Sequence, residues 1–249
     1  TELEIEALKE LEKLIDNKLA AGKQPTPAEL TCLSSYKALH EYAWIELVTM
    51  PMELQELECR QVIEPEEERQ LRSKMPILRE IKDNISRNVR KQYEENPYPR
   101  WVNTELPLVS KPIASITKQM KLRIKNPDIN KVINPQILIA GSGTGQHSIE
   151  TAARFKDCDV LAIDLSLSSL AYAKRKTEEL GISKIEYMQA DILDLGTLNR
   201  QFDIIESAGV LHHMDDPMAG WEVLAGCLKT GGLIKIGLYS ELARSHIGQ

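Results

Sequence analysis

The second half of the chain is predicted to form a doubly wound, mainly parallel α/β sheet, preceded by an α-helical N-terminal region. Two observations predict the sheet. From Pro135 onward, short apolar runs alternate with stretches of helical periodicity, and a glycine run lies directly between one such strand and one such helix. This alternation is typical of a parallel sheet covered by helices on both faces. The first 95 residues instead repeat apolar side chains every three to four positions, which indicates amphipathic helices.

The helical region begins with two expected helices. An apolar stripe from Leu3 to Leu19 predicts the first, and this stripe is expected to be core or a self-association interface. Thr26 or Thr31 is expected to cap the second helix, which Pro51 ends. The N-terminal domain therefore opens with a helical pair joined by a short loop.

A third helix is expected to begin near Pro65, where a run of glutamates suits the positive end of the helix dipole. It should continue to Tyr93, with Pro76 as a kink or a break. The proline-rich stretch that follows opens a predicted linker or lid segment over residues 96–130, with a short helix at 113–124. We therefore divide the chain at residues 95 and 130, with the α/β domain at 131–249.

Each element of that domain has its own pattern. Strands are predicted at residues 137–140, 160–164, 185–189, 202–207 and 233–239, and helices at 145–155, 167–180 and 215–229.

Composition excludes several classes of protein. The formal net charge of −6 argues against a general nucleic-acid binder or a membrane-surface protein, because phosphates and anionic lipids attract excess Lys and Arg. No apolar run approaches the roughly 20 residues that span a bilayer, and no signal-peptide pattern opens the chain. The scattered cysteines form no C-x-x-C pair, so we expect buried thiols, no metal site and a cytoplasmic location.

The glycine run and two carboxylates predict a nucleotide site. Gly141-Ser142-Gly143-Thr144-Gly145 directly precedes a helix, whose N-terminus favours an anionic group. Asp164 ends the next strand, where a carboxylate can accept both ribose hydroxyls, unless it only caps the following helix. Asp191 ends the third strand, where it can accept from an adenine amino group while Ile192 packs on the ring, unless it is a loop cap. Ligands of open α/β sheets bind at these strand ends.

Two nucleotide cofactors fit this pattern. A dinucleotide fingerprint reads G-x-G-x-x-G, but Gln146 occupies the position of its third glycine. The loop therefore argues against a pyrophosphate ligand, and an NAD-dependent oxidoreductase is the less favoured interpretation.

Over residues 131–240, the sequence resembles class I S-adenosylmethionine (SAM)-dependent methyltransferases. The motifs that carry the resemblance are ILIAGSGTGQ, VLAIDLSLSSLAYAKRK, YMQADILDL, FDIIESAGVLHHMDDP and LKTGGLIKIGLYS. GVLHH and LKTGG are similar to the type 11 and type 12 groups, and YEENPYPRW resembles tetratricopeptide-linked bacterial methyltransferases. The resemblance implies a Rossmann-like fold, SAM as cofactor and methyl transfer to an unidentified small-molecule or protein acceptor.

The resemblance also implies a set of cofactor contacts. These are Ala140, Gly141, Ser142, Gly143, Gly145, Gln146, Asp164, Leu165, Asp191, Ile192, Ser207 and Ala208. Two departures from the family pattern matter. Ile139 stands where an acidic residue often precedes the loop, and the helix and strand pair that usually follow the fifth strand are absent. Because the sequence begins at Thr1 and stops at Gln249, we expect either a fragment or a sheet that is completed differently.

Methyl transfer from a sulfonium demands chiefly alignment of the reacting atoms. A base is needed only when the nucleophile must lose a proton early. His212 is the candidate base, unless it only packs the start of the next helix; Glu206 and Tyr239 are further candidates and are more simply lining residues. Substrate contacts are expected from Tyr98, Arg100, Trp101, His213 and Tyr239.

The segment from Tyr98 to Trp101 is interpreted either as a cover over the site or as a rigid linker. Its prolines stiffen it, and its aromatic rings and Arg100 offer stacking and anion binding. A non-catalytic SAM-fold module that binds a partner through its helices is the alternative function of a different class.

Overall fold

The computed structural model describes residues 1–95 and 97–239, and the chain divides into two compact units, Thr1–Gln70 and Leu71–Gln249. The second unit begins well before residue 95, so the segment from Leu71 onward shares a unit with the sheet. Each unit has its own buried core. Within the described residues, no helix is both long and apolar enough to cross a membrane.

The first unit starts with the two expected helices, but the second is shorter than predicted. The helix α1 (Glu2–Ala20) begins with a capping box at Thr1, and α2 (Pro27–Ser34) begins with one at Thr26. We predicted that the second helix would reach Pro51, and this was wrong. Both Ser34 and Ser35 donate their hydroxyls to the Thr31 carbonyl, a local alternative that competes with helix continuation.

Three short 3₁₀ turns replace the rest of that predicted helix: η1 (Leu39–Glu41), η2 (Ile45–Leu47) and η3 (Met52–Leu54). They still bury the apolar residues of the pattern, since Leu39 and Trp44 join Ile15, Leu30 and Leu33 in one core cluster. The cysteine expectation holds only in part, because Cys158 and Cys227 are buried whereas Cys32 and Cys59 are exposed.

The third predicted helix is divided into several pieces. It begins at Gln55 as α3 (Gln55–Glu58), widens into a π-helical turn, η4 (Cys59–Ile63), and continues as α4 (Glu64–Ser73). The π turn lies just before Pro65, which has no backbone N–H to donate. Helix α5 (Asn84–Glu95) is separate, so Pro76 marks a break rather than a kink.

The segment between α4 and α5 runs along an outer strand of the sheet. The backbone N–H of Gln189 donates to Pro76 O at 2.8 Å, and the N–H of Leu78 donates to Gln189 O at 2.9 Å. The pairing extends the parallel sheet by one bridge, between Ile77 and Gln189. This break therefore covers part of a strand edge that would otherwise expose its hydrogen-bonding groups.

The second unit confirms the predicted α/β fold. Its parallel strands are β1 (Gln136–Ala140), β2 (Asp159–Asp164), β3 (Ile185–Gln189), β4 (Phe202–Ala208) and β5 (Leu228–Gly237), in the order β3-β2-β1-β4-β5. β5 begins at Leu228 rather than 233, because the LKTGG turn already pairs with β4 across an irregular register. The order reverses between β1 and β4, and this is where open α/β sheets bind ligands.

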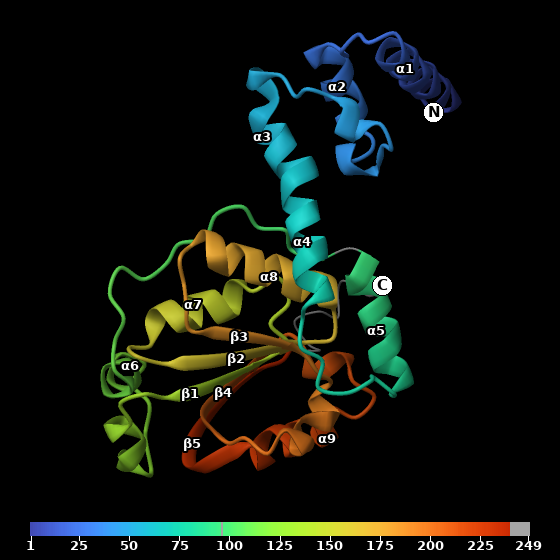
Figure 1. The fold of residues 1–249 in the computed structure, drawn as a ribbon. Helices are drawn as coiled ribbons and strands as arrows, with labels where there is room; N and C mark the ends of the chain where they lie inside the picture. Colours follow the sequence, from blue (N-terminus) through green and yellow to red (C-terminus); the bar gives the residue numbers. More distant parts are fainter. Residues whose placement is uncertain (96, 240–249) are drawn as a thin grey trace. The chain divides into compact units, whose positions relative to one another are not determined.

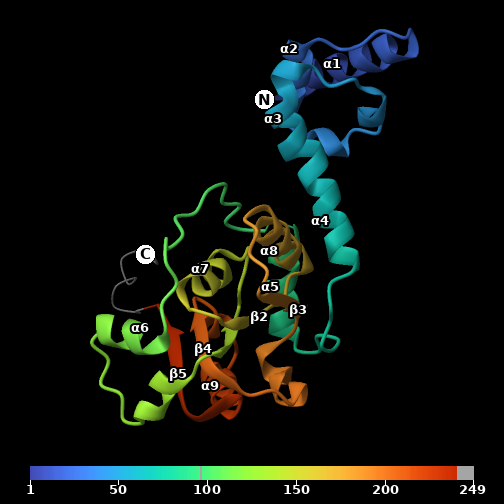
Figure 2. The ribbon, with the colours of Figure 1, turned by 60° about the vertical axis from the view of Figure 1, so that its left-hand side comes forward.

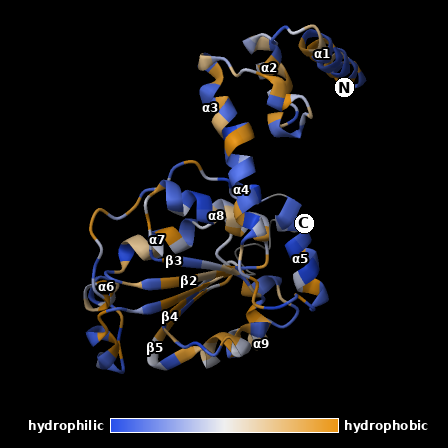
Figure 3. Cartoon of the chain, viewed as in Figure 1, coloured by the Kyte–Doolittle hydropathy of each residue, from blue (hydrophilic) through white to orange (hydrophobic). Residues whose placement is uncertain are grey.

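Helices cover both faces of this sheet (Figures 1 and 2). Against one face pack α6 (Ile113–Gln119), α7 (Gln146–Arg154) and α8 (Leu167–Glu179), and against the other pack η6 (Ile192–Leu198), η7 (Leu211–His213) and α9 (Pro217–Gly226). η5 (Pro127–Lys131) precedes β1. The inner strands are largely hydrophobic along their length (Figure 3), as expected for strands buried on both faces.

Candidate functional site

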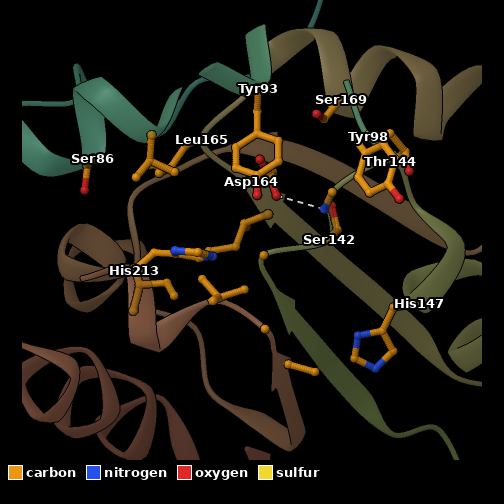
Figure 4. Close-up of a pocket in the computed structure, with 18 of the residues that line it drawn as sticks. Ser86, Tyr93, Tyr98, Ser142, Thr144, His147, Asp164, Leu165, Ser169 and His213 are labelled. Atoms are coloured by element: carbon orange, nitrogen blue, oxygen red, sulfur yellow. Dashed lines mark hydrogen bonds between the residues drawn. The ribbon is translucent and has the colours of Figure 1, made fainter. Parts of the chain in front are cut away.

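A cavity of about 710 Å³ opens at the carboxyl ends of the strands, a volume typical of small-molecule sites. The loops after β1, β2, β3 and β4 line it, together with α5 and the Tyr98–Pro99 segment. Figure 4 shows Asp164 bonded to the glycine loop, with His213 across the pocket and His147 on the side of the loop away from Asp164. The pocket therefore lies at the strand ends that carry the sequence motifs.

The glycine loop adopts, at three of its positions, backbone conformations that favour glycine. Gly141, Gly143 and Gly145 have φ angles of 82°, 51° and 90°, in a region that other residues rarely adopt. A Cβ at Gly141 would lie 2.1 Å from Val210, and one at Gly145 would lie 2.5 Å from the Cβ of Ala173. Gly141 thus permits close approach of the β4 loop, and Gly145 permits close packing of α8.

Asp164 fastens this loop to the end of β2. One carboxylate oxygen accepts from the backbone N–H of Gly143 at 2.8 Å, and the other accepts from that of Ser166 at 3.0 Å. Burial raises the pKa of Asp164, while these backbone hydrogen bonds act in the opposite direction. Each carboxylate oxygen has a further lone pair for a hydroxyl donor, so the loop contact and a ribose contact are compatible.

The adenine side of the predicted site is formed by the loop after β3. Asp191 is buried and caps η6, where it accepts from the backbone N–H of Leu193 at 3.0 Å. Asp191 and the buried Ile192 both line the pocket. The cap interpretation and the ligand interpretation of Asp191 therefore coexist, because the cap occupies only one of its oxygens.

On the other side of the glycine loop, His147 and Glu206 form a hydrogen-bonded pair. His147 Nε2 lies 2.6 Å from Glu206 Oε2, and Arg154 donates to the second oxygen of Glu206 at 2.8 Å. Burial alone would raise the pKa of Glu206, but His147, Arg154 and Lys235 lower it to about 2. Glu206 is therefore a buried carboxylate that stays ionised, and its charge fixes the ring of His147 at the pocket wall.

The proline-rich segment is anchored to the glycine loop. Thr144 donates its hydroxyl to Pro99 O at 2.6 Å, and the indole N–H of Trp101 donates to Thr144 O at 3.0 Å. Tyr172 donates to Trp101 O, and Lys176 donates to Val102 O at 3.0 Å. These contacts hold Tyr98 and Pro99 at the pocket. The proline-rich segment is therefore fixed to the glycine loop and also forms part of the pocket wall.

The structure brings most of the predicted site residues together. Those that line the pocket are Tyr98, Gly141, Ser142, Gly143, Gln146, Asp164, Leu165, Asp191, Ile192, Ala208, His213 and Tyr239.

The remaining predicted residues lie beside the pocket rather than in its wall. Ala140 and Ser207 are buried within their strands, and Gly145 packs against α8. The Arg100 guanidinium lies over the Tyr172 ring at 4.6 Å, and Trp101 is buried in the α8-side core.

His212, the candidate base, also does not line the pocket. Its ring packs 4.2 Å, centroid to centroid, from the rings of His213 and Tyr239, which do line it. His212 therefore supports two wall residues rather than facing the cavity itself.

The sequence motifs did not reveal every wall residue. Helix α5 contributes Ile85, Ser86, Val89 and Tyr93, and α7 contributes His147. The strong amphipathic pattern of α5 was a signal, but it was assigned to the helical region because nothing local indicates which surface the helix packs on. His147 directly follows the glycine loop, and its position at the N-terminus of α7 could have suggested a role.

Residues 137–232 match the family model of a methyltransferase domain. This match confirms, for that segment, the resemblance to a methyltransferase domain that the motifs predicted. The chain is 37% identical over 116 residues to an uncharacterized protein of Synechococcus sp., which covers 46% of this chain and 28% of that protein. It is 36% identical over 83 residues to a release factor glutamine methyltransferase of Flavobacterium psychrophilum, covering 33% of this chain and 29% of that enzyme.

The chain thus spans less than a third of the length of these two curated relatives. Among solved structures, a putative SAM-dependent methyltransferase of Methanococcus maripaludis is similar at 19% identity and a TM-score of 0.40, covering 69% of this chain and 73% of that one. The magnesium protoporphyrin IX methyltransferase of Synechocystis with bound SAM is similar at 20% identity and a TM-score of 0.41, covering 61% and 75%.

Proposed function

We propose that this protein binds SAM in the pocket at the strand ends and transfers its methyl group to an acceptor. The observation that carries the proposal is the coincidence of the methyltransferase-domain match with a pocket that gathers the glycine loop, Asp164 and Asp191. In this arrangement Asp191 and Ile192 hold the adenine, and Asp164 accepts from the ribose hydroxyls.

The residues of the pocket fit this cofactor. Ser142 lines the pocket, and its buried hydroxyl has no hydrogen-bond partner within the described part of the chain. Such an atom is costly unless a ligand or a water satisfies it. A nucleoside with polar edges at this point would provide a partner, while the apolar side chains of Ile163, Ile192 and Val210 would contact its base and sugar.

SAM supplies a methyl group that is already activated, so the protein contributes chiefly orientation and exclusion of water. The glycine loop and Asp164 fix one side of the cofactor. Tyr93 from α5 and Tyr98 from the anchored segment line the same pocket, and Tyr98 is exposed. Their rings would shield the reacting atoms from water.

The acceptor would enter near His213 and Tyr239, at the ends of β4 and β5. Its identity is left open between a small molecule and a protein side chain, because neither residue defines one chemical class. An NAD-dependent oxidoreductase finds no support in the family match, and Gln146 still replaces the third dinucleotide glycine. A non-catalytic SAM-binding module is the remaining alternative.

Methyl transfer can be tested with SAM that carries an isotopic label on the methyl group. The labelled cofactor is incubated with the protein and with small-molecule and protein fractions of a bacterial extract. We expect label to accumulate in one fraction, and the Asp164→Ala variant should abolish this transfer. If the protein binds SAM but no fraction gains label above the Asp164→Ala background, the non-catalytic alternative is correct.

A further inference from the structure

The binding site for the amino-acid end of the cofactor follows from the strand order. Asp191, Asp164 and the glycine loop follow β3, β2 and β1, which are neighbours in the sheet. Adenine, ribose and sulfur would therefore lie in that order along the strand ends. The amino-acid group beyond the sulfur then comes to the side of β4 and α7. Figure 4 shows His147 there, on the side of the loop away from Asp164.

An amino-acid group needs an acceptor for its ammonium, and β1 provides none. Ile139 is apolar, and in the register of the sheet it lies directly beside Glu206 on β4. A buried carboxylate, Glu206, thus lies one strand away, with a side chain that is 6% exposed. Glu206 does not line the pocket, whereas His147, which is bound to it, does.

The charge of Glu206 determines which nitrogen of His147 is available. An ionised carboxylate can only accept hydrogen bonds, so Nε2 of His147 must carry the proton that it donates at 2.6 Å. In the neutral ring, Nδ1 is then left as an acceptor. Within the part of the chain that the structure describes, no hydrogen-bond partner of Nδ1 is recorded, and the His147 side chain is 25% exposed at the pocket wall.

Other charged groups surround this position. On α7 are Glu150, which lines the pocket, and Arg154, which pairs with Glu206. On β5, Lys235 also lines the pocket and lies 3.6 Å from Glu206. Glu206 therefore has two cationic neighbours, Arg154 and Lys235, beside its contact with His147.

We propose that His147, oriented by Glu206, accepts a hydrogen bond from the ammonium of the cofactor's amino-acid end, while Lys235 attracts the carboxylate. This inference rests on the proposed function, since it assigns residues to one end of the proposed cofactor. His147 is the contacting residue, and Glu206 is a positioning residue that fixes the tautomer. The pair replaces a carboxylate on β1, so it determines how well the protein distinguishes the complete cofactor from its nucleoside part.

The test compares two ligands by calorimetry at about pH 8, where free imidazole is neutral. S-adenosylhomocysteine carries the amino-acid end, and 5′-methylthioadenosine lacks it but keeps the adenosine and the sulfur. In the His147→Phe variant we expect the affinity for S-adenosylhomocysteine to fall about tenfold, as for one lost charge-assisted hydrogen bond. The affinity for methylthioadenosine should stay within about twofold, which also shows that the variant is folded.

Two further variants separate the role of the pair from general effects. In Glu206→Gln, the new amide can donate to Nε2 of His147 and reverse its tautomer. The ratio of the affinity for S-adenosylhomocysteine to the affinity for methylthioadenosine should therefore fall, as in His147→Phe. His40→Phe makes the matched change at a histidine of the first unit, which does not line the pocket, and the ratio should be unchanged.

Three results would contradict the inference about His147, and a fourth would contradict the proposed function as well. Equal losses for both ligands in His147→Phe, no loss for either, or equal affinities for both ligands in the parent would each overturn the assignment of His147 while leaving the proposed cofactor intact. If the parent binds neither ligand, the proposed function itself fails.

Discussion

Asp164 serves the fold and the candidate cofactor site with the same carboxylate. It closes the glycine loop through Gly143 and the turn after β2 through Ser166. Burial raises its pKa, which means that the charged form of this carboxyl group is costly in its buried position. Two hydroxyl donors of a ribose would add hydrogen bonds to the charged form, so ligand binding would offset this cost.

Asp164→Ala should weaken the binding of S-adenosylhomocysteine and of methylthioadenosine to a similar extent, because both ligands contain the ribose. A lost charge-assisted hydrogen bond costs roughly 1.5–3 kcal/mol, which corresponds to a loss of about tenfold to a hundredfold in affinity. Calorimetry of both ligands measures it.

The control is Asp159→Ala, at the opposite end of the same strand, where the side chain accepts from Gln136 at 2.8 Å. It should leave both affinities unchanged. Parental affinity in Asp164→Ala would mean that this carboxylate only closes the loop.

Residue types at strand ends could be predicted from sequence, but side chains that meet across the fold could not. Asp164 and Asp191 stand out because each directly follows an apolar strand. The pairing of His147 with Glu206 depends on a separation of 59 positions and on the register of β1 with β4. For the same reason the sequence favoured His212, which follows a strand, although the structure packs its ring against those of His213 and Tyr239 and leaves it out of the pocket wall.

At the scale of elements, the glycine loop connects β1 to α7 and packs against α8. Gly145 and Gly143 both have positive φ angles, but only Gly145 lies against a neighbouring helix. The predicted strands and helices of the second unit were largely correct because each has its own apolar period. Elements of the helical N-terminal region were less predictable. Ser34 and Ser35 at the end of α2 donate to a backbone carbonyl, and Pro76 after α4 has no backbone N–H to donate, so both interrupt the predicted helices.

Gly143→Ala and Gly145→Ala should therefore differ in stability. At Gly143 nothing lies within 4 Å of a new Cβ, so only the backbone conformation costs energy, about 1–2 kcal/mol. At Gly145 the Cβ would also meet the Ala173 Cβ at 2.5 Å, and overpacking adds about 1–3 kcal/mol. Urea denaturation measures both free energies of unfolding, and equal values would show that α8 is not packed on the loop.

At the scale of the whole molecule, the pocket at the carboxyl ends of the strands brings together segments from distant parts of the sequence. The pocket draws residues from α5 through to Tyr239, and all of them belong to the unit that begins at Leu71. Local periodicity predicted a mainly parallel sheet through the general preferences of α/β folds, and it gave no strand order. It could not predict that α5 would leave the helical region and form a wall of the pocket.

The most direct test of the central claim is calorimetric titration of the full chain with S-adenosylhomocysteine and, separately, with NADH. The glycine loop, Asp164 and Asp191 form a site that fits one nucleoside with an amino-acid end, and Gln146 disfavours a pyrophosphate. We predict binding of S-adenosylhomocysteine at a stoichiometry near one with no heat from NADH. Saturable binding of NADH without any response to S-adenosylhomocysteine would contradict the account.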